Sequence, residues 1–332
     1  MLILQKLTEQ VFRILVIGAF LYLSGCASSE VTPAVAEKPH RQDLYQGQSH
    51  VAMSVGSPQS ELQALERAMD EERTGNFDKA LYSYIQALDF NKSNPETLYK
   101  IARIHMAKGN DDIANRAYNE TLMLAPQHLL ANAELGILEF DQRFYTRARK
   151  HLEQAIAIDQ QRLNSLDIEQ GIEHSIALDE LSPLRVYNAI AILEDLENNH
   201  DKAKDYFRLV LDFQPQSAVI STNFGYSYYL TGDLVNAEYY FRQALKDDSN
   251  FGRAWSNLGL IYIRKGQYGK ALVSFEQTMT KADAFNDLGY FLMLEGHYQK
   301  AIEMFQKAID SSPSYFERAQ KNLKIALASK LN

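Results

Sequence analysis

Apolar residues recur at helical spacing along most of the chain, and the alternating β-branched runs that are typical of strands are scarce. Alanines lie 34 residues apart in two sets of three, at 80, 114 and 148 and at 203, 237 and 271, and Ala301 follows 30 residues later. A fixed period in this range is typical of a solenoid, in which each unit repeats one piece of local structure. The pattern therefore predicts an all-α fold built from helical hairpins.

Seven units follow from this period, and they begin near Glu61, Pro95, Leu129, Leu184, Ala218, Gly252 and Ala282. Repeats 1–3 fill residues 61–160, and repeats 4–7 fill residues 184–314. Ala148 and Ala203 are 55 residues apart, so residues 161–183 form an insertion, which adds a helix, lengthens two helices or divides the array into two lobes. The step to Ala301 is short, and we expect the turn around Thr280 to be trimmed. Residues 315–332 have one apolar stripe, from Phe316 to Leu327, and are expected to form a capping helix.

The repeat motif is clearest in the fifth and sixth units, which read Asn223-Phe224-Gly225-Tyr226 and Asn257-Leu258-Gly259-Leu260. Seven residues after each glycine comes a second one, and an alanine and a phenylalanine follow: Gly232, Ala237 and Phe241, and Gly266, Ala271 and Phe275. This motif resembles the tetratricopeptide repeat, and the resemblance covers nearly all of residues 61–314. Two helices that cross closely need small side chains at the contact, and the second glycine ends the first helix in a left-handed conformation.

The amino-terminal residues follow the pattern of a secretory signal. Lys6 and Arg13 precede an apolar run that is too short for a comfortable membrane span. The run ends in Leu23-Ser24-Gly25-Cys26, which resembles the lipobox of bacterial lipoproteins. This resemblance implies that residues 1–25 are removed and that Cys26 carries a covalent lipid. Since alanine and not aspartate follows Cys26, it also implies the periplasmic face of the outer membrane. A plain signal peptide or a single-pass anchor is the alternative.

Residues 26–60 are expected to be an acylated amino terminus followed by a flexible tether, because they contain scattered Ser, Pro and Gly and little helical periodicity. The net charge of the chain is -8, without a cluster of Lys and Arg, which argues against a nucleic-acid partner. We find no phosphate loop, zinc-binding histidine pair or nucleophile elbow. The sequence therefore predicts no enzyme, no metal and no cofactor apart from the lipid on Cys26.

In tetratricopeptide arrays the first helices line a groove with the second, fifth, ninth and twelfth positions of each unit. Carried onto this sequence, the resemblance implies a partner-binding groove that includes Tyr99, Phe140, Asn188, Thr222, Tyr226, Tyr229, Arg253, Ser256, Asn286, Tyr290 and Met293. Aromatic rings among amides suit an extended or helical peptide. Alternatively, some of these side chains pack inward. The charged clamp with which chaperone adaptors hold a terminal carboxylate is not matched.

Three functions remain at this point. The stretch from Ala284 to Tyr290, with Ser311-Ser312-Pro313 after it, resembles the TadD lipoproteins of tight-adherence (Flp) pili. That resemblance implies an outer-membrane scaffold that assists pilus or secretin assembly. The second function is a periplasmic adaptor for peptidoglycan hydrolases or proteases, similar to the NlpI type of lipoprotein. The third is an enzyme whose site lies in the insertion, where Glu169, Glu173 and His174 are found.

Overall fold

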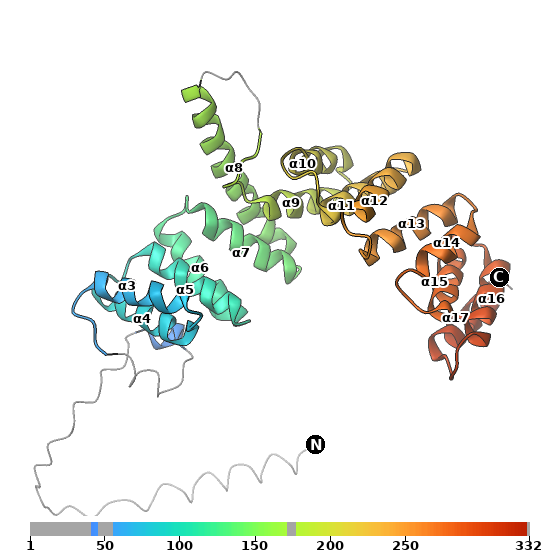
Figure 1. Ribbon diagram of the computed structural model, residues 1–332, viewed down its shortest axis with the longest axis horizontal. Helices are drawn as coiled ribbons and strands as arrows, with labels where there is room; N and C mark the ends of the chain where they lie inside the picture. Colours follow the sequence, from blue (N-terminus) through green and yellow to red (C-terminus); the bar gives the residue numbers. More distant parts are fainter. Residues whose placement is uncertain (1–40, 46–55, 171–176, 331–332) are drawn as a thin grey trace, which may run out of the picture. The chain divides into compact units, whose positions relative to one another are not determined.

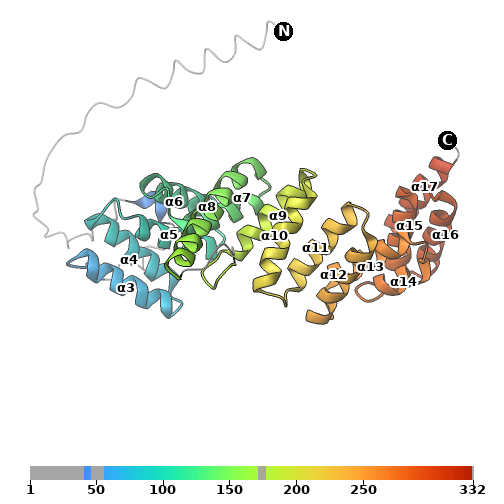
Figure 2. The same ribbon diagram turned by 90° about the horizontal axis from the view of Figure 1, so that it is seen from above.

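The computed structural model describes residues 41–45, 56–170 and 177–330, with the backbone alone for residues 166–170. Within these residues the regular structure is entirely helical, and the helices form successive antiparallel pairs in chain order (Figures 1 and 2). Each pair is one repeat. The pairs of repeats 1–4 are α3 (Glu61–Arg73) with α4 (Phe77–Phe90), α5 (Pro95–Ala107) with α6 (Asp111–Leu124), α7 (Leu129–Asp141) with α8 (Tyr145–Gln170), and α9 (Leu184–Leu196) with α10 (His200–Phe213).

Repeats 5–7 continue the same arrangement. They are α11 (Ala218–Leu230) with α12 (Leu234–Asp247), α13 (Gly252–Arg264) with α14 (Tyr268–Phe275), and α15 (Lys281–Leu294) with α16 (Tyr298–Asp310). The predicted unit starts coincide with the starts of the first helices, except that α15 begins one residue earlier, at Lys281. The prediction of an all-α solenoid of about seven helical hairpins is confirmed.

The two helices of each hairpin cross where the motif places its small residues. A Cβ atom added at Gly259 on α13 would lie 2.3 Å from Cε1 of Phe275 on α14, which is a severe overlap. The corresponding glycines on α7, α11 and α15 face Leu152, Phe241 and Phe305 in the same way. Position eight of the repeat therefore sets how closely the helices pack, and the predicted reason for its glycine is confirmed.

The turn between the two helices has a left-handed residue in all seven repeats. Gly75, Gly109, Gly232, Gly266 and Gly296 have φ angles between 67° and 80°. Repeats 3 and 4 have no glycine at this place, yet Arg143 and Asn198 adopt the same conformation, each with φ at 64°. The requirement is therefore set by the hairpin geometry, and these two repeats meet it with an arginine, which rarely adopts this conformation, and an asparagine, which tolerates it.

The insertion lengthens a helix and does not divide the array. Helix α8 has 26 residues where its partner α7 has 13, and it extends well past α7 in Figure 1. One continuous apolar core runs from Ala133 on α7 to Phe224 on α11. Arg149 on α8 donates to Glu194 on α9 across a distance of 2.7 Å. The alternative of two lobes separated by the insertion is therefore wrong.

The spacing from Ala271 to Ala301 is 30 residues and not 34 because the second helix of repeat 6 is shortened. Helix α14 has 8 residues, whereas α12 and α10 have 14. Thr280 is the N-cap of α15, and its hydroxyl accepts the backbone amide hydrogen of Asp283. The expectation of a trimmed turn is wrong, because the residues are missing from the end of α14. After repeat 7, α17 (Glu317–Lys330) packs on α15 and α16 as the capping helix, although Leu327 of the expected stripe is 47% exposed.

A short segment of the expected tether is folded onto the first repeats. The 3-10 helix η1 (Gln42–Leu44) lies beside α6, and Leu44 is completely buried. We call residues 41–45 the N-terminal strap. The expectation of a flexible tether is therefore wrong for these five residues. The expected signal sequence, Cys26 and the rest of residues 1–40 lie outside the described residues. No helix within the described ranges is long and apolar enough to cross a membrane.

Candidate partner-binding pocket

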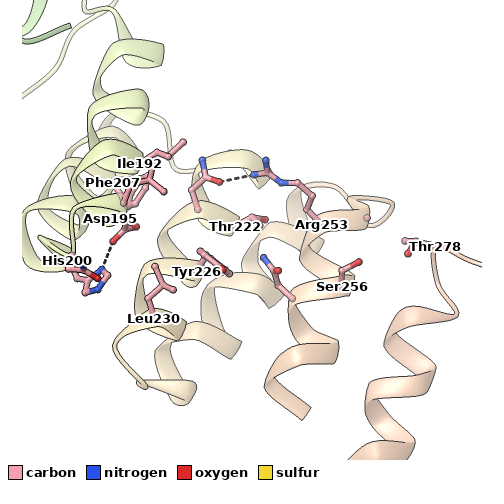
Figure 3. A pocket seen from close by; sticks show the side chains of 15 residues that line it. Ile192, Asp195, His200, Phe207, Thr222, Tyr226, Leu230, Arg253, Ser256 and Thr278 are labelled. Carbon is pink, nitrogen blue, oxygen red and sulfur yellow. Dashed lines mark hydrogen bonds and ion pairs between the residues drawn. The ribbon is translucent and has the colours of Figure 1, made fainter. Parts of the chain in front are cut away.

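The first helices of repeats 4, 5 and 6 surround a pocket with a volume of about 790 Å³ (Figure 3). Helix α11 forms its centre, and its ends are fixed locally, because Ser217 caps the first turn and Gly232 follows the last one. Four residues from one face of α11 line the pocket: Thr222, Asn223, Tyr226 and Leu230. The pocket therefore lies on the face where the sequence placed a groove.

One wall of the pocket is apolar. Tyr226 and Leu230 on α11 are 41% and 40% exposed, and Ile192 on α9 completes this wall. Tyr226 stacks on Tyr229, whose ring centroid is 5.7 Å away, and the Arg264 guanidinium lies 4.1 Å above the Tyr229 ring. Burial raises the pKa of Tyr229, and Arg264 opposes this effect. A stacked ring held in this way offers apolar area at little conformational cost.

The opposite rim carries a row of polar side chains from successive repeats. Arg253 on α13 donates to Oδ1 of Asn223 at 2.7 Å, and the Asn223 amide donates to Asn188 on α9 at 2.8 Å. The Asn223 contact holds Arg253 at the rim while its guanidinium stays exposed (Figure 3). Within the described part of the chain, the buried hydroxyl of Thr222 has no hydrogen-bond partner. The rim can therefore bind a carboxylate.

A serine, a histidine and an aspartate meet at one side of the pocket without forming a catalytic triad. His200 Nδ1 lies 2.8 Å from Oδ1 of Asp195, and Ser227 Oγ donates to the same carboxylate oxygen, also at 2.8 Å. In a nucleophilic triad the serine must donate to the histidine, which takes its proton. Here both side chains bind Asp195, so the cluster ties α11 to α9 and does not activate Ser227. No group of metal ligands is found among the described residues.

The predicted groove residues fall into four groups. Thr222, Tyr226, Arg253 and Ser256 line the pocket, and Tyr229 supports it. Phe140 and Asn188 line a neighbouring pocket of about 340 Å³ between repeats 3, 4 and 5. Tyr290 is 40% exposed on α15, and Met293 packs partly against the core.

Tyr99 and Asn286 are buried, with 4% and 2% exposure, so the expectation that a partner reaches them is wrong. The Tyr99 ring packs against His128 and Tyr118, and Asn286 accepts a hydrogen bond from Asn322 on the capping helix. The sequence analysis also missed part of the lining: Leu196, Asn198, His200, Phe207, Leu230, Asn257 and Thr278. Most of these lie on turns or second helices, which a rule for first helices does not reach.

Models of the family described as tetratricopeptide repeat match residues 99–162, 184–217, 240–273 and 282–315, which together make up half of the chain. The chain is a tetratricopeptide-repeat protein. It is 26% identical over 175 residues to the cell division cycle protein 16 homologs of Homo sapiens and Mus musculus, which is 52% of this chain and 26% of each relative. This tetratricopeptide-repeat protein therefore spans about a quarter of the length of the curated relatives it matches.

Solved structures have the same fold at low identity. The APC/C hetero-tetramer Cut9–Hcn1 is 15% identical, with 78% of this chain and 48% of that chain covered and a TM-score of 0.50. The structure titled as the functional characterization of Pseudomonas aeruginosa PilF is 14% identical, with 74% and 97% covered and a TM-score of 0.49. The Cut9–Hcn1 likeness agrees with a tetratricopeptide-repeat solenoid, a fold that typically acts as a protein-interaction scaffold without catalysis.

Proposed function

We propose that this tetratricopeptide-repeat protein is an outer-membrane lipoprotein scaffold that assists pilus or secretin assembly by holding a segment of a partner protein in the pocket of repeats 4–6. The lipobox-like sequence that ends at Cys26 supports the anchor and the location. The TadD-like stretch between Ala284 and Tyr290 supports the link to tight-adherence pili. The pocket supports the binding of a protein segment.

The pocket is the single observation that carries the proposal. It combines the apolar wall of Tyr226 and Leu230 with the cationic rim at Arg253. This chemistry fits an extended segment with one large apolar side chain and one carboxylate. The apolar side chain would supply most of the binding energy, and the carboxylate would fix its orientation.

The partner is tested by affinity purification of the full chain from a native cell envelope. We expect secretin or other pilus-assembly components to co-purify with the wild type and several-fold less with Tyr226→Ala, which loses the exposed ring. Tyr239→Ala is the matched control, since Tyr239 is 53% exposed on α12 but lies outside the pocket. Equal capture by all three proteins would contradict binding in the pocket. Capture of peptidoglycan hydrolases or proteases would instead favour an NlpI-like adaptor.

The anchor is tested separately by metabolic labelling with a palmitate analogue. The wild type should take up label and fractionate with the outer membrane, and Cys26→Ala should do neither, because the thiol is the acylated group. An unlabelled wild type would remove the lipoprotein part of the proposal while leaving the pocket untouched.

A further inference from the structure

The N-terminal strap lies against α4, α5 and α6, and we call the place where it lies the notch. Both terminal nitrogens of Arg41 donate to the carboxylate of Glu120 on α6, at 2.7 and 2.6 Å. Arg41 also donates to Asp43 within the strap, at 3.1 and 3.2 Å. A paired, bidentate arginine contact of this kind is geometrically specific.

Apolar contacts hold the other end of the strap. Leu44 is completely buried and belongs to the core that α4, α5 and α6 share. Tyr45 packs edge-on against Tyr82 of α4, with ring centroids 5.4 Å apart. Full burial of a leucine side chain contributes about 2 kcal/mol to holding the strap in place.

His105 on α5 forms the floor of the notch. The residue is completely buried, and its Nε2 atom lies 2.8 Å from the carbonyl oxygen of Leu44. Its Nδ1 atom lies 3.3 Å from Nδ2 of the Asn110 side chain. These partners fit the neutral ring, in which Nε2 donates to Leu44 and Nδ1 accepts from Asn110.

Burial and two neighbouring cations disfavour a second proton on this ring. Burial lowers the pKa of His105, the Leu44 carbonyl opposes this effect, and the cations Lys108 on α5 and Arg116 on α6 lower it further. Arg116 also donates to the backbone oxygen of Asp43 at 3.4 Å, so it is held at the strap.

The carboxylates around the notch already have cationic partners. Asp43 and Glu120 bind Arg41, and Asp78 on α4 binds Lys108. An imidazolium at position 105 would thus be buried beside two cations without a carboxylate of its own among the described residues, and such a charge is costly. Departure of the strap removes the backbone that covers Nε2 and gives the charged ring access to water.

We propose that this notch is a docking site for the chain's own residues 41–45, and that it holds them only while His105 is neutral, so that acidification releases the strap. Docking is strongest above the ordinary histidine pKa of about 6.5 and weakens as the pH falls below that value. One proton is taken up on release, so the equilibrium constant for release rises by up to about tenfold per pH unit in this range. Release exposes the Glu120 carboxylate and the apolar floor of the notch.

Amide hydrogen exchange of the full chain at pH 7.5 and pH 5.5, corrected for intrinsic rates, tests this proposal. The amides of Leu44 and Tyr45 donate to Arg41 and Gln42 and report docking directly. We expect their protection to fall by up to about tenfold at pH 5.5, whereas the amides inside α6 keep theirs. Equal corrected protection at both pH values would overturn the proposal.

Three variants separate the His105 effect from general acid sensitivity. Leu44→Asp places a carboxylate at a buried site and should leave the strap unprotected at both pH values. His105→Gln keeps a donor for the Leu44 carbonyl but does not titrate, so its protection should not change between pH 7.5 and pH 5.5. Gln42→Ala alters an exposed strap residue and should behave like the wild type. A His105→Gln variant with the wild-type pH dependence would also overturn the proposal.

A direct titration decides the case in which His105→Gln fails to hold the strap at pH 7.5. The His105 ring is followed by NMR in the wild type and in Leu44→Asp, where the strap no longer covers the ring. We expect a lower titration midpoint in the wild type. Equal midpoints would show that the strap and the proton do not compete.

Discussion

Repeats 2 and 5 have the same hairpin but use the same face differently. At position five, repeat 2 has Tyr99, which is 4% exposed, whereas repeat 5 has Thr222, whose short side chain borders the pocket. At position nine, repeat 2 has Arg103, whose cation lies 5.9 Å from the Tyr99 ring, and repeat 5 has the exposed ring of Tyr226. The first-helix face is thus filled in one repeat and open in the other.

The polarity of the side chain at position five differs between these two parts of the array. Repeats 1–3 have apolar or aromatic residues there, Leu65, Tyr99 and Ala133, and Tyr99 and Ala133 are buried. Repeats 4–6 have small polar residues there: Asn188, Thr222 and Ser256. The comparison teaches that the side chains of the first-helix face can fill it or leave it open without a change in fold.

The largest expected effect comes from emptying the filled face. Tyr99→Ser removes a buried ring from the core of repeats 1 and 2, and we expect the free energy of unfolding to fall by about 3–5 kcal/mol. Urea denaturation followed by circular dichroism measures it. Tyr290→Ser is the control, since Tyr290 is 40% exposed and should cost under about 1 kcal/mol. A loss at Tyr99 as small as that at Tyr290 would break the comparison.

The next effect concerns the Glu238 carboxylate, which joins repeat 5 to repeat 6 behind the open face. Burial raises the pKa of Glu238 on α12, but hydrogen bonds from Lys265, Arg242 and Tyr262 outweigh it and lower the pKa from 4.5 to about 2. The folded-state pKa is depressed, so this contact stabilises the fold above about pH 4.5, and the contribution is lost as the pH falls through about 2.

Glu238→Gln should therefore lower the free energy of unfolding at pH 7 by about 1–3 kcal/mol. Denaturation of both proteins across a pH series measures the difference, which should shrink as the pH falls toward 2. A difference that stays constant from pH 7 to pH 2 would mean that the charge of Glu238 does not matter for stability.

Filling the open face should abolish binding at little cost in stability. Ser256→Tyr places a ring in the pocket, and we expect capture of the envelope partner to weaken at least about tenfold, while the free energy of unfolding changes by less than about 1 kcal/mol. Lys246→Tyr adds the same ring at an exposed position of α12 and should bind like the wild type. Undiminished capture by Ser256→Tyr would place the binding face elsewhere.

The smallest expected effect lies in the turns. Arg143→Gly removes the cost of a left-handed side chain and should stabilise the protein by about 1 kcal/mol. Asn198→Gly should gain only a few tenths of a kcal/mol, roughly, since asparagine tolerates this conformation. Thermal unfolding of the two variants measures both gains. A larger gain at Asn198 than at Arg143 would contradict the conformational explanation.

The period of the sequence predicted the hairpins because its residues have a fixed physical task. Gly259 must lack a side chain where α13 meets Phe275, so the helix crossing could be placed from the sequence alone. The same rule placed Tyr226 and Arg253 on the open face. The burial of Asn286 could not be predicted from the sequence, because its partner Asn322 lies on the capping helix, 36 residues further along the chain.

The strap escaped prediction for a similar reason. Residues 41–45 are too few to show a period, and their contacts lie far along the chain, 61 residues away at His105 and 79 residues away at Glu120. Scattered polar and flexible residues around them favoured a tether. The burial of Leu44 depends on a notch that exists only after repeats 1 and 2 have packed.

Site-specific photocrosslinking in the living cell tests most directly whether the open face of repeats 4–6 is the docking face. A photoreactive phenylalanine derivative replaces Tyr226 in one strain and Arg103, the same position of repeat 2, in another. We predict a discrete adduct with an envelope protein from position 226 and none from position 103. Adducts of equal yield from both positions, or from position 103 alone, would contradict the account.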